Sequence, residues 1–169
     1  PGKVLMNILG EPMILQQLRR LKMSVRLDDI IVATSLEKSD DELAMVCLAA
    51  GYRVFRGSLD DVLDRFVKAI ENDSCDHVVR LTADCPLTDP NVIDEIIGRH
   101  LQGDSDYTSN TLNPTYPDGL DAEVFKISAL LNAWENAVLP SHREHVTPYM
   151  YGHPEIFSLD SYENDRDLS

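Results

Sequence analysis

Basic residues, cysteines and long apolar runs are scarce in this chain of 169 residues, and each shortage narrows its possible functions. Fifteen lysines and arginines stand against 29 aspartates and glutamates, so the formal net charge is −14. Because a nucleic-acid surface needs a concentrated basic patch, we expect no nucleic-acid partner. An anionic small substrate would need local cations or a metal ion to offset the surrounding negative field.

The three cysteines, Cys47, Cys75 and Cys85, form no metal-type pair, and an odd number is a poor disulfide framework. Cys47 lies in an apolar helical stretch, which favours a small buried side chain over a reactive thiol. No apolar run approaches the ~20 residues that a membrane-spanning helix needs. We therefore expect no membrane partner and a location in the cytoplasm.

The remaining composition, with 43% hydrophobic and 26% charged residues, is typical of a globular protein, and the length suits one domain. Short apolar strands alternate with helices that have one apolar face. The predicted strands are 29–34, 52–55, 78–82, 106–109, 120–125 and 156–159. The predicted helices are 12–24, 39–51, 60–72, 89–101, 128–138 and 141–151. Ser39 and Glu42 have the spacing of a capping box at the start of the helix 39–51. This alternation predicts an α/β fold with a mostly parallel sheet.

Asp84 is the strongest candidate for a functional residue, because it lies two residues after the predicted strand 78–82 and two residues before Pro86. In an open parallel sheet, ligands bind outside the carboxyl ends of the strands. A lone carboxylate in such a place suits Mg²⁺, which typically takes one or two protein carboxylates and leaves its other positions to phosphate and water. The alternative is a turn residue that bonds the local backbone.

The loop 116–125 is the second candidate, and it contains Asp118 within a Pro-Asp-Gly turn. Asp121 and Glu123 are two residues apart in a predicted strand and therefore share a face. Such carboxylates could accept sugar hydroxyls or help to hold a cation. A solvated strand face is the alternative.

Two further groups carry weaker signals. His142 and His145 are spaced as i and i+3, but no third zinc ligand stands at a suitable spacing. Arg143 and His145 could instead contact an anionic substrate, although a helical turn with paired charges would look the same. Lys3, beside Gly2, could reach a phosphate as a point charge.

Five segments occur together, in this order, in a known group of proteins. They are residues 1–5, 55–63, 80–87, 116–125 and 143–149. The chain thereby resembles the spore-coat polysaccharide biosynthesis proteins of the cytidylyltransferase family, which are similar to CMP-KDO synthetase and acylneuraminate cytidylyltransferase. The likeness covers nearly all of the chain, and several motifs in register are more specific than any one alone.

The resemblance implies a nucleotide-diphospho-sugar transferase fold, a Rossmann-like three-layer α/β/α sandwich. It also implies transfer of CMP from CTP, or of another nucleotidyl group, to a sugar or sugar acid with release of pyrophosphate. Lys3 and Thr82 would bind the nucleotide, Asp84 would hold Mg²⁺, and Arg80 would assist catalysis. The sugar would face five residues: Asp118, Asp121, Glu123, Arg143 and His145. A homodimer is expected from the same likeness.

The resemblance also implies parts that lie outside this sequence. The family's first strand with its nucleotide loop would precede Pro1, and a second acidic metal ligand would follow Ser169, so we expect residues 1–169 to be an excerpt of one domain. Two other functions stay open: a non-catalytic family member that binds a sugar nucleotide or scaffolds a partner, and a zinc hydrolase that uses His142 and His145.

Overall fold

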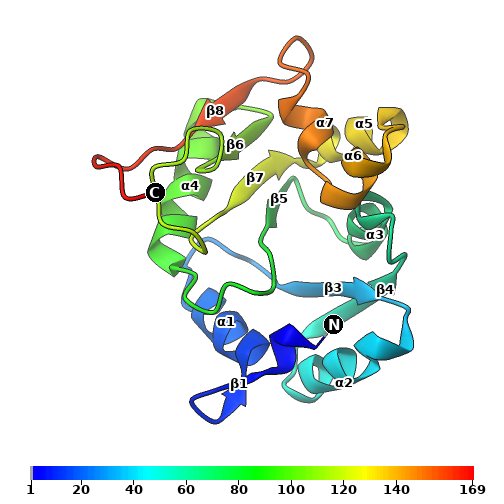
Figure 1. Cartoon of the computed structure of the whole chain (residues 1–169). Coiled ribbons are helices and arrows are strands. Elements are labelled where there is room, and N and C mark those ends of the chain that lie inside the picture. The colour runs from blue at the N-terminus through cyan, green and yellow to red at the C-terminus, as the bar shows by residue number, and fades with distance from the viewer. Residues whose placement is uncertain (1) are drawn as a thin grey trace.

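The structure is a computed structural model, and it describes residues 2–169. Strands and helices alternate along the chain (Figure 1). The first part contains η1 (Lys3–Leu5), β1 (Asn7–Ile8), β2 (Glu11–Pro12), α1 (Met13–Leu21), β3 (Ile31–Ser35), η2 (Lys38–Asp40), α2 (Asp41–Ala49), β4 (Arg53–Gly57), α3 (Val62–Ala69), β5 (His77–Arg80) and α4 (Pro90–Gly103). The second part contains β6 (Tyr107–Ser109), β7 (Glu123–Lys126), α5 (Ile127–Asn136), α6 (Pro140–His145), α7 (Pro148–Tyr151) and β8 (Leu159–Ser161).

The strands form a parallel pair β3–β4, a short hairpin β1–β2 and a four-stranded sheet in the order β5-β7-β6-β8. In the four-stranded sheet β6 and β8 are parallel, whereas β7 runs antiparallel to both β5 and β6. The α/β class is therefore confirmed, but a mostly parallel sheet is not what this part of the chain forms. The chain enters β7 from the long loop after β6 rather than from a crossover helix, and this path reverses its direction.

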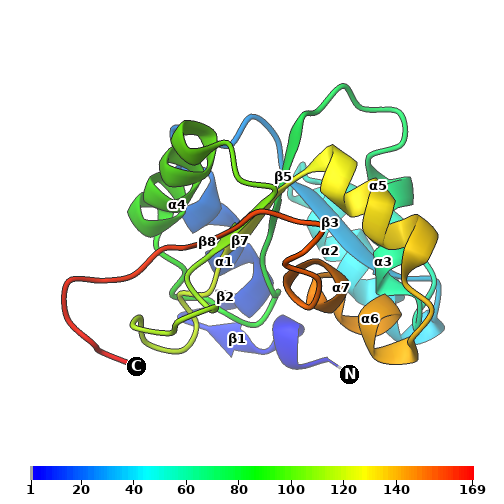
Figure 2. The same cartoon turned by 90° about the horizontal axis from the view of Figure 1, so that it is seen from above.

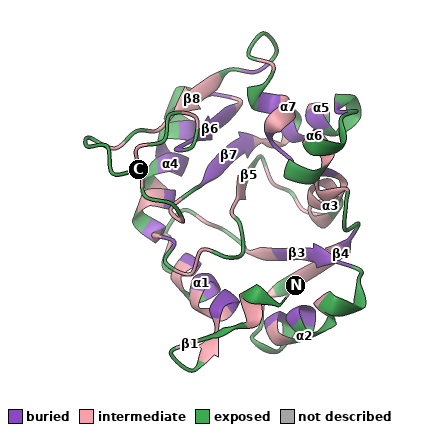
Figure 3. Cartoon of the chain, in the orientation of Figure 1, coloured by how far each residue is buried: buried purple, intermediate pink, exposed green. Residues whose placement is uncertain are grey.

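Helices cover both faces of the strands (Figure 2). Helix α4 packs on β6 and β7 from one side, and α5 packs on β7 from the other. Consecutive residues of β7 pack on opposite faces of the strand. Val124 belongs to the apolar cluster with Ile93 and Ile96, and Phe125 belongs to the cluster with Leu130. Both β7 side chains are fully buried, so β7 appears as a buried strand in Figure 3. Burial on both faces makes β7 a rigid support for residues at its start.

Three local predictions need correction. The capping box expected at Ser39 and Glu42 is wrong, because α2 begins at Asp41 and has no side-chain cap. The Asp40 carboxylate instead accepts hydrogen bonds from the Ser35 backbone and from the hydroxyls of Thr34 and Ser35. The strand expected at 156–159 begins only at Leu159.

The helix expected at 141–151 is in fact two helices, α6 and α7, that meet at Val146. Val146 is fully buried with φ 72° and ψ −59°, and the Thr147 amide donates to the His145 carbonyl at 2.9 Å. This is a γ-turn, a strained conformation for a β-branched residue. Pro148 cannot continue a helix from α6, so it starts the next one.

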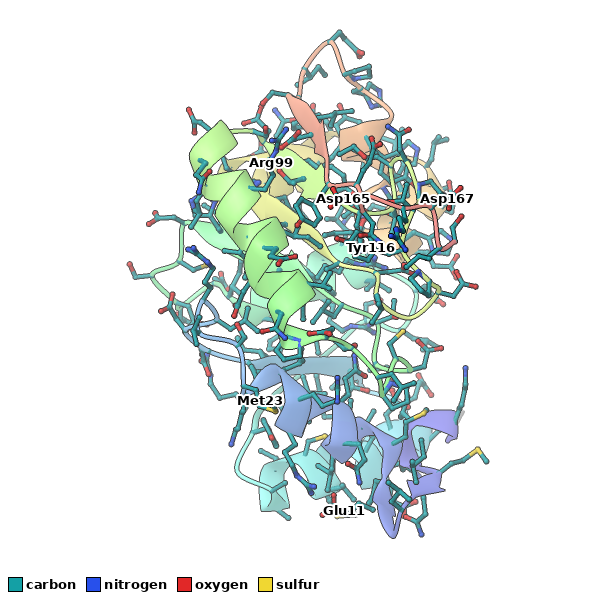
Figure 4. All side chains as sticks on the ribbon, turned by 90° about the vertical axis from the view of Figure 1, so that its left-hand side faces the viewer. Glu11, Met23, Arg99, Tyr116, Asp165 and Asp167 are labelled. Carbon is teal, nitrogen blue, oxygen red and sulfur yellow. The ribbon has the colours of Figure 1, made fainter. Side chains whose placement is uncertain are left out.

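The C-terminal segment folds back over the loop that follows β6. The amides of Leu168 and Asn164 donate to Thr115, and the rings of Tyr116 and Tyr162 stack at a centroid distance of 6.0 Å. Figure 4 shows Tyr116 on the same side of the molecule as Asp165 and Asp167. None of the helices within residues 2–169 is long and apolar enough to cross a bilayer.

Candidate functional site

Asp84 lies in the loop that leaves β5, four residues after Arg80, which ends the strand. Its carboxylate accepts a hydrogen bond from Lys3 Nζ at 3.1 Å, across a separation of 81 residues. The two side chains are 45% and 68% exposed, so this ion pair is open to solvent and to ligands. The Lys3 bond, followed by the Thr82 hydroxyl, lowers the pKa of Asp84, so the carboxylate is ionised at neutral pH.

The Asp84 loop is anchored by helix α1. The buried Gln17 side chain donates to the Thr82 carbonyl at 2.7 Å, and Arg20 Nε donates to the Thr88 carbonyl at 2.6 Å. Thr88 Oγ1 in turn donates to the Cys85 carbonyl at 2.7 Å, which closes the loop upon itself. Since these bonds hold the backbone on both sides of Asp84, the carboxylate has a defined position beside η1.

The donor set around Asp84 fits magnesium better than zinc. Residues 2–169 contain no group of three or more His, Cys, Asp or Glu side chains arranged to hold a metal ion. This excludes an all-protein zinc site at His142 and His145 within that range. A single ionised, half-exposed carboxylate is compatible with Mg²⁺, which shares its coordination sphere with phosphate and water.

A polar pocket of about 410 Å³ adjoins the Asp84 loop and shares Thr82 with it. The end of β5, the start of β7 and the ends of α6 and α7 contribute its walls. Its polar lining includes Arg80, Thr82, Asp121, Glu123, His145 and Thr147. The structure thus brings five of the predicted site residues, which lie between Arg80 and His145 in the chain, to one pocket.

Glu123 lines this pocket from a buried position, with 7% of its surface exposed. Its Oε1 accepts hydrogen bonds from the Tyr107 hydroxyl and from Thr147 Oγ1, both at 2.6 Å. Its Oε2 accepts a hydrogen bond from Arg80 Nη1, and the two residues are direct cross-strand partners in the β5–β7 pair. Burial, followed by the Glu123 charge, raises the pKa of Tyr107, so the phenol stays protonated and can donate.

Asp121 differs from Glu123 although it is only two residues away. It lines the same pocket, but its carboxylate has no hydrogen-bond or ion-pair partner among residues 2–169. Although Asp121 is exposed as a residue, the surrounding protein partly desolvates its carboxylate, and this desolvation, followed by the charges of Asp118 and Glu123, raises the pKa of Asp121. Asp118 itself does not line the pocket and influences it through this charge.

Arg143 does not line the pocket, and this differs from the expectation that it faces the sugar. Its Nε and Nη2 atoms bind the Asp61 carboxylate at 2.6–3.0 Å, and its Nη1 donates to the Trp134 carbonyl at 2.7 Å. Asp61 also caps helix α3 by accepting from the Asp64 amide. Arg143 therefore connects α6 to the start of α3 and to α5.

The γ-turn at Val146 gives the pocket two of its side chains. Because the chain reverses within three residues, His145 and Thr147 both reach the pocket lining while Val146 packs into the apolar core. Sequence reasoning assigned no role to Thr147 or to Tyr107. Tyr107 lies in the short predicted strand 106–109, and nothing in the local sequence indicates that its hydroxyl meets a carboxylate 16 residues away.

An α/β fold with an ionised carboxylate at a strand exit, beside a polar pocket, is typical of enzymes that bind ligands at the carboxyl ends of strands. Comparison with known proteins specifies the class further. The family model of the cytidylyltransferases matches residues 1–167. The chain therefore belongs to the cytidylyltransferase family, and the resemblance seen in its motifs is confirmed. Pro1, the first residue of these motifs, lies outside the described residues.

Two curated relatives match nearly the whole chain. An uncharacterized protein of Methanocaldococcus jannaschii is 47% identical over 159 residues, which are 94% of this chain and 64% of that protein. The spore coat polysaccharide biosynthesis protein SpsF of Bacillus subtilis is 36% identical over 168 residues, which are 96% of this chain and 69% of that protein. The chain thus spans about two thirds of the length of these relatives.

Two solved structures share the fold. A cytidylyltransferase from Leptospira borgpetersenii superposes with a TM-score of 0.94 at 34% identity, over 100% of this chain and 72% of the other. A CMP:2-keto-3-deoxy-manno-octonic acid synthetase, solved in complex with CTP, superposes with a TM-score of 0.72 at 16% identity, over 97% and 83% of the two chains. At this low identity the second likeness concerns the fold alone.

Proposed function

We propose that the protein containing this chain transfers the CMP group of CTP to a hydroxyl of a sugar or sugar acid and releases pyrophosphate. The product would serve the biosynthesis of a surface polysaccharide, such as a spore coat. The observation that carries this proposal is the Lys3–Asp84 pair at the exit of β5, directly beside a polar pocket that shares Thr82 with it. A charged end for a triphosphate and a separate pocket for an acceptor are what such a transfer needs.

The residues of the chain divide the proposed work between these two places. Lys3 offers a solvent-exposed ammonium to phosphate oxygens, and Thr82 lies between the pair and the pocket. Arg80, held by Glu123, lines the pocket, where its remaining N–H donors could orient an acceptor or a phosphate oxygen. Catalysis of this reaction consists mostly of positioning and charge neutralisation, so fixed groups of this kind are effective.

Asp84 is the residue that we propose for Mg²⁺. When bound, the ion would neutralise negative charge on the phosphate oxygens as the bond to pyrophosphate breaks. The lowered pKa of Asp84 keeps its carboxylate in the ionised form that a hard cation requires. A Rossmann-like three-layer sandwich, a homodimer and a cytoplasmic location also remain part of the proposal. The helices on both faces of the strands support the first of these.

The decisive experiment measures pyrophosphate release by the full-length protein with CTP, Mg²⁺ and a panel of 2-keto-3-deoxy sugar acids, neutral hexoses and amino sugars. We expect turnover with at least one acceptor, and a fall of at least ~100-fold for Asp84→Asn, since charge neutralisation is the largest single catalytic contribution. Asp76→Asn is the matched control, because Asp76 is an exposed aspartate just before the other end of β5.

Each failure has its own meaning. If CTP binds with Mg²⁺ in a thermal-shift assay but no acceptor supports turnover, the enzyme proposal fails and a non-catalytic binding protein is indicated. If the wild-type protein turns over and Asp84→Asn does so at the same rate, the assignment of Asp84 fails while the reaction stands.

A further inference from the structure

Two carboxylates, Asp121 and Glu123, line the pocket and differ in their hydrogen bonding. Both oxygens of Glu123 are engaged, because they accept three hydrogen bonds from Tyr107, Thr147 and Arg80. Asp121 contacts the same pocket without a partner for its carboxylate in the described part of the chain. A buried carboxylate whose two oxygens both accept hydrogen bonds cannot take up a proton without losing one of them, whereas a carboxylate without such bonds can.

The backbone around Asp121 is held in place although its side chain is free. The buried side chain of Asn110 spans this residue: its Nδ2 donates to the Leu120 carbonyl and its Oδ1 accepts from the Ala122 amide, both at 2.9 Å. The Ala122 carbonyl also accepts from Ser109 Oγ at 3.0 Å. The peptide units on either side of Asp121 are therefore fixed, and a fixed backbone with a free side chain is suited to contact a ligand.

We propose that Asp121 is the general base of the transfer reaction, an inference that rests on the cytidylyl transfer proposed above. The acceptor hydroxyl would give its proton to an Asp121 carboxylate oxygen. The acceptor oxygen would form a bond to the α-phosphorus of CTP, and the bond from that phosphorus to the bridging oxygen would break, so that pyrophosphate leaves with the electron pair. The proton remains on Asp121 until it is released to solvent.

The charges around Asp121 support this role. The titratable groups that face it are Asp118 on its own loop, Glu123 on β7, Arg80 on β5, His145 at the end of α6 and Tyr151 on α7. Desolvation by the surrounding protein disfavours a negative charge on Asp121, and the two neighbouring carboxylates, Asp118 and Glu123, act in the same direction. A base whose proton affinity is raised toward the working pH accepts a proton more effectively than an ordinary aspartate.

Glu123 then acts as a positioning residue, and it does not contact the reacting atoms. It holds the Arg80 guanidinium at the pocket wall, and Tyr107 and Thr147 hold Glu123. His145 is the competing candidate for the base, because it lines the same pocket. The experiment has to separate Asp121 from His145 and from a purely structural effect.

The test compares Asp121→Asn, His145→Gln and the control Asp76→Asn in the full-length protein, with CTP and the acceptor of the panel that supports turnover. For Asp121→Asn we expect kcat to fall about 100- to 10,000-fold, the usual range for loss of a general base. We expect the KM for CTP to change less than about threefold, because the Lys3–Asp84 pair stays intact. The acidic limb of the pH profile of kcat should be lost in this variant and kept in His145→Gln.

Three results would overturn the assignment. The first is Asp121→Asn turnover within about threefold of wild type, and the second is an unchanged acidic limb in that variant. The third is loss of the limb in His145→Gln, which would make His145 the base. If Asp121→Asn does not fold, formate is added to Asp121→Ala: recovery of turnover in proportion to formate supports the proposal, and no recovery contradicts it. Absence of turnover in the wild-type protein would instead refute the transfer reaction itself.

Discussion

Replacing Glu123 by alanine should be among the most destabilising single changes in the pocket. The substitution removes the acceptor of the Arg80 guanidinium, the fully buried Tyr107 hydroxyl and the Thr147 hydroxyl. Leaving one partner of a buried ion pair without the other typically costs about 3–5 kcal/mol. Each hydroxyl that loses its acceptor, on Tyr107 and on Thr147, adds up to ~1–3 kcal/mol to this destabilisation when no water replaces the acceptor.

These costs are not additive here, because the adjoining pocket admits water and Arg80 keeps 20% of its side chain exposed. We therefore expect Glu123→Ala to lower the free energy of unfolding by about 3–5 kcal/mol in total, a large part of the roughly 5–15 kcal/mol that a domain has. Urea unfolding of the full-length protein, followed by far-UV circular dichroism, should show a midpoint lower by about 1.5–2.5 M for a slope near 2 kcal/mol per M.

The double variant Arg80→Met with Glu123→Leu is the informative control. It removes both charges at once, so no charged group is left buried without a partner, and we expect it to be at least ~1 kcal/mol more stable than Glu123→Ala. A loss below ~1 kcal/mol for Glu123→Ala would refute the reasoning. A double variant that is no more stable than Glu123→Ala would also refute it, because the destabilisation would then not come from the unpaired Arg80 guanidinium.

Two further predictions concern residues outside the pocket. Arg143→Lys keeps the charge but loses the two-nitrogen contact with Asp61 and the hydrogen bond to the Trp134 carbonyl. The melting temperature should therefore fall by about 3–6 °C, for a loss of ~1–2 kcal/mol in the free energy of unfolding. Calorimetry that finds no change would contradict the role of Arg143 in connecting α6 to α3 and α5. His100 is 1% exposed between His77 and Thr108, and burial followed by the His77 charge lowers its pKa to about 4. The unfolded chain then binds a proton that the folded chain excludes between about pH 4 and 6.5, so the stability contributed by neutral His100 is lost as the pH falls through this window. Wild type should be about 2 kcal/mol less stable at pH 5 than at pH 7 from this cause, and urea midpoints at both pH values should show a smaller difference in His100→Leu.

Much of the architecture could be predicted from local patterns. The apolar stripe over 12–24 becomes α1, and the aspartate-proline pair at Asp89 starts α4, where the Asp89 side chain accepts from the Asn91 amide. Cys47 is fully buried, as its apolar surroundings predicted, and burial raises its pKa to about 11. These features depend on a few consecutive residues, and tertiary contacts reinforce them rather than oppose them.

Features that depend on distant partners could not be predicted in this way. The predicted capping box at Ser39 and Glu42 had the right spacing, but Asp40 makes better bonds to Thr34 and Ser35 at the end of β3. Arg143 was expected at the sugar because the family resemblance implied that place for it. Its partner Asp61 is 82 positions earlier in the chain, and no local rule connects the two.

The direction of β7 accounts for the most important difference between expectation and structure. If β7 were parallel to β5, its first residue would lie at the opposite edge of the sheet from the last residue of β5, and Glu123 would be remote from Arg80. In the antiparallel arrangement the end of β5 meets the start of β7, so Arg80 and Glu123 are cross-strand partners at the edge where the Asp84 loop leaves the sheet. The same reversal brings the acidic loop before β7, with Asp121, to the pocket beside Asp84. The antiparallel direction of β7 thus gives two carboxylates that look equivalent in the sequence different roles. Glu123, inside the strand, binds its cross-strand partner Arg80, whereas Asp121, just before the strand, remains available to bind a ligand.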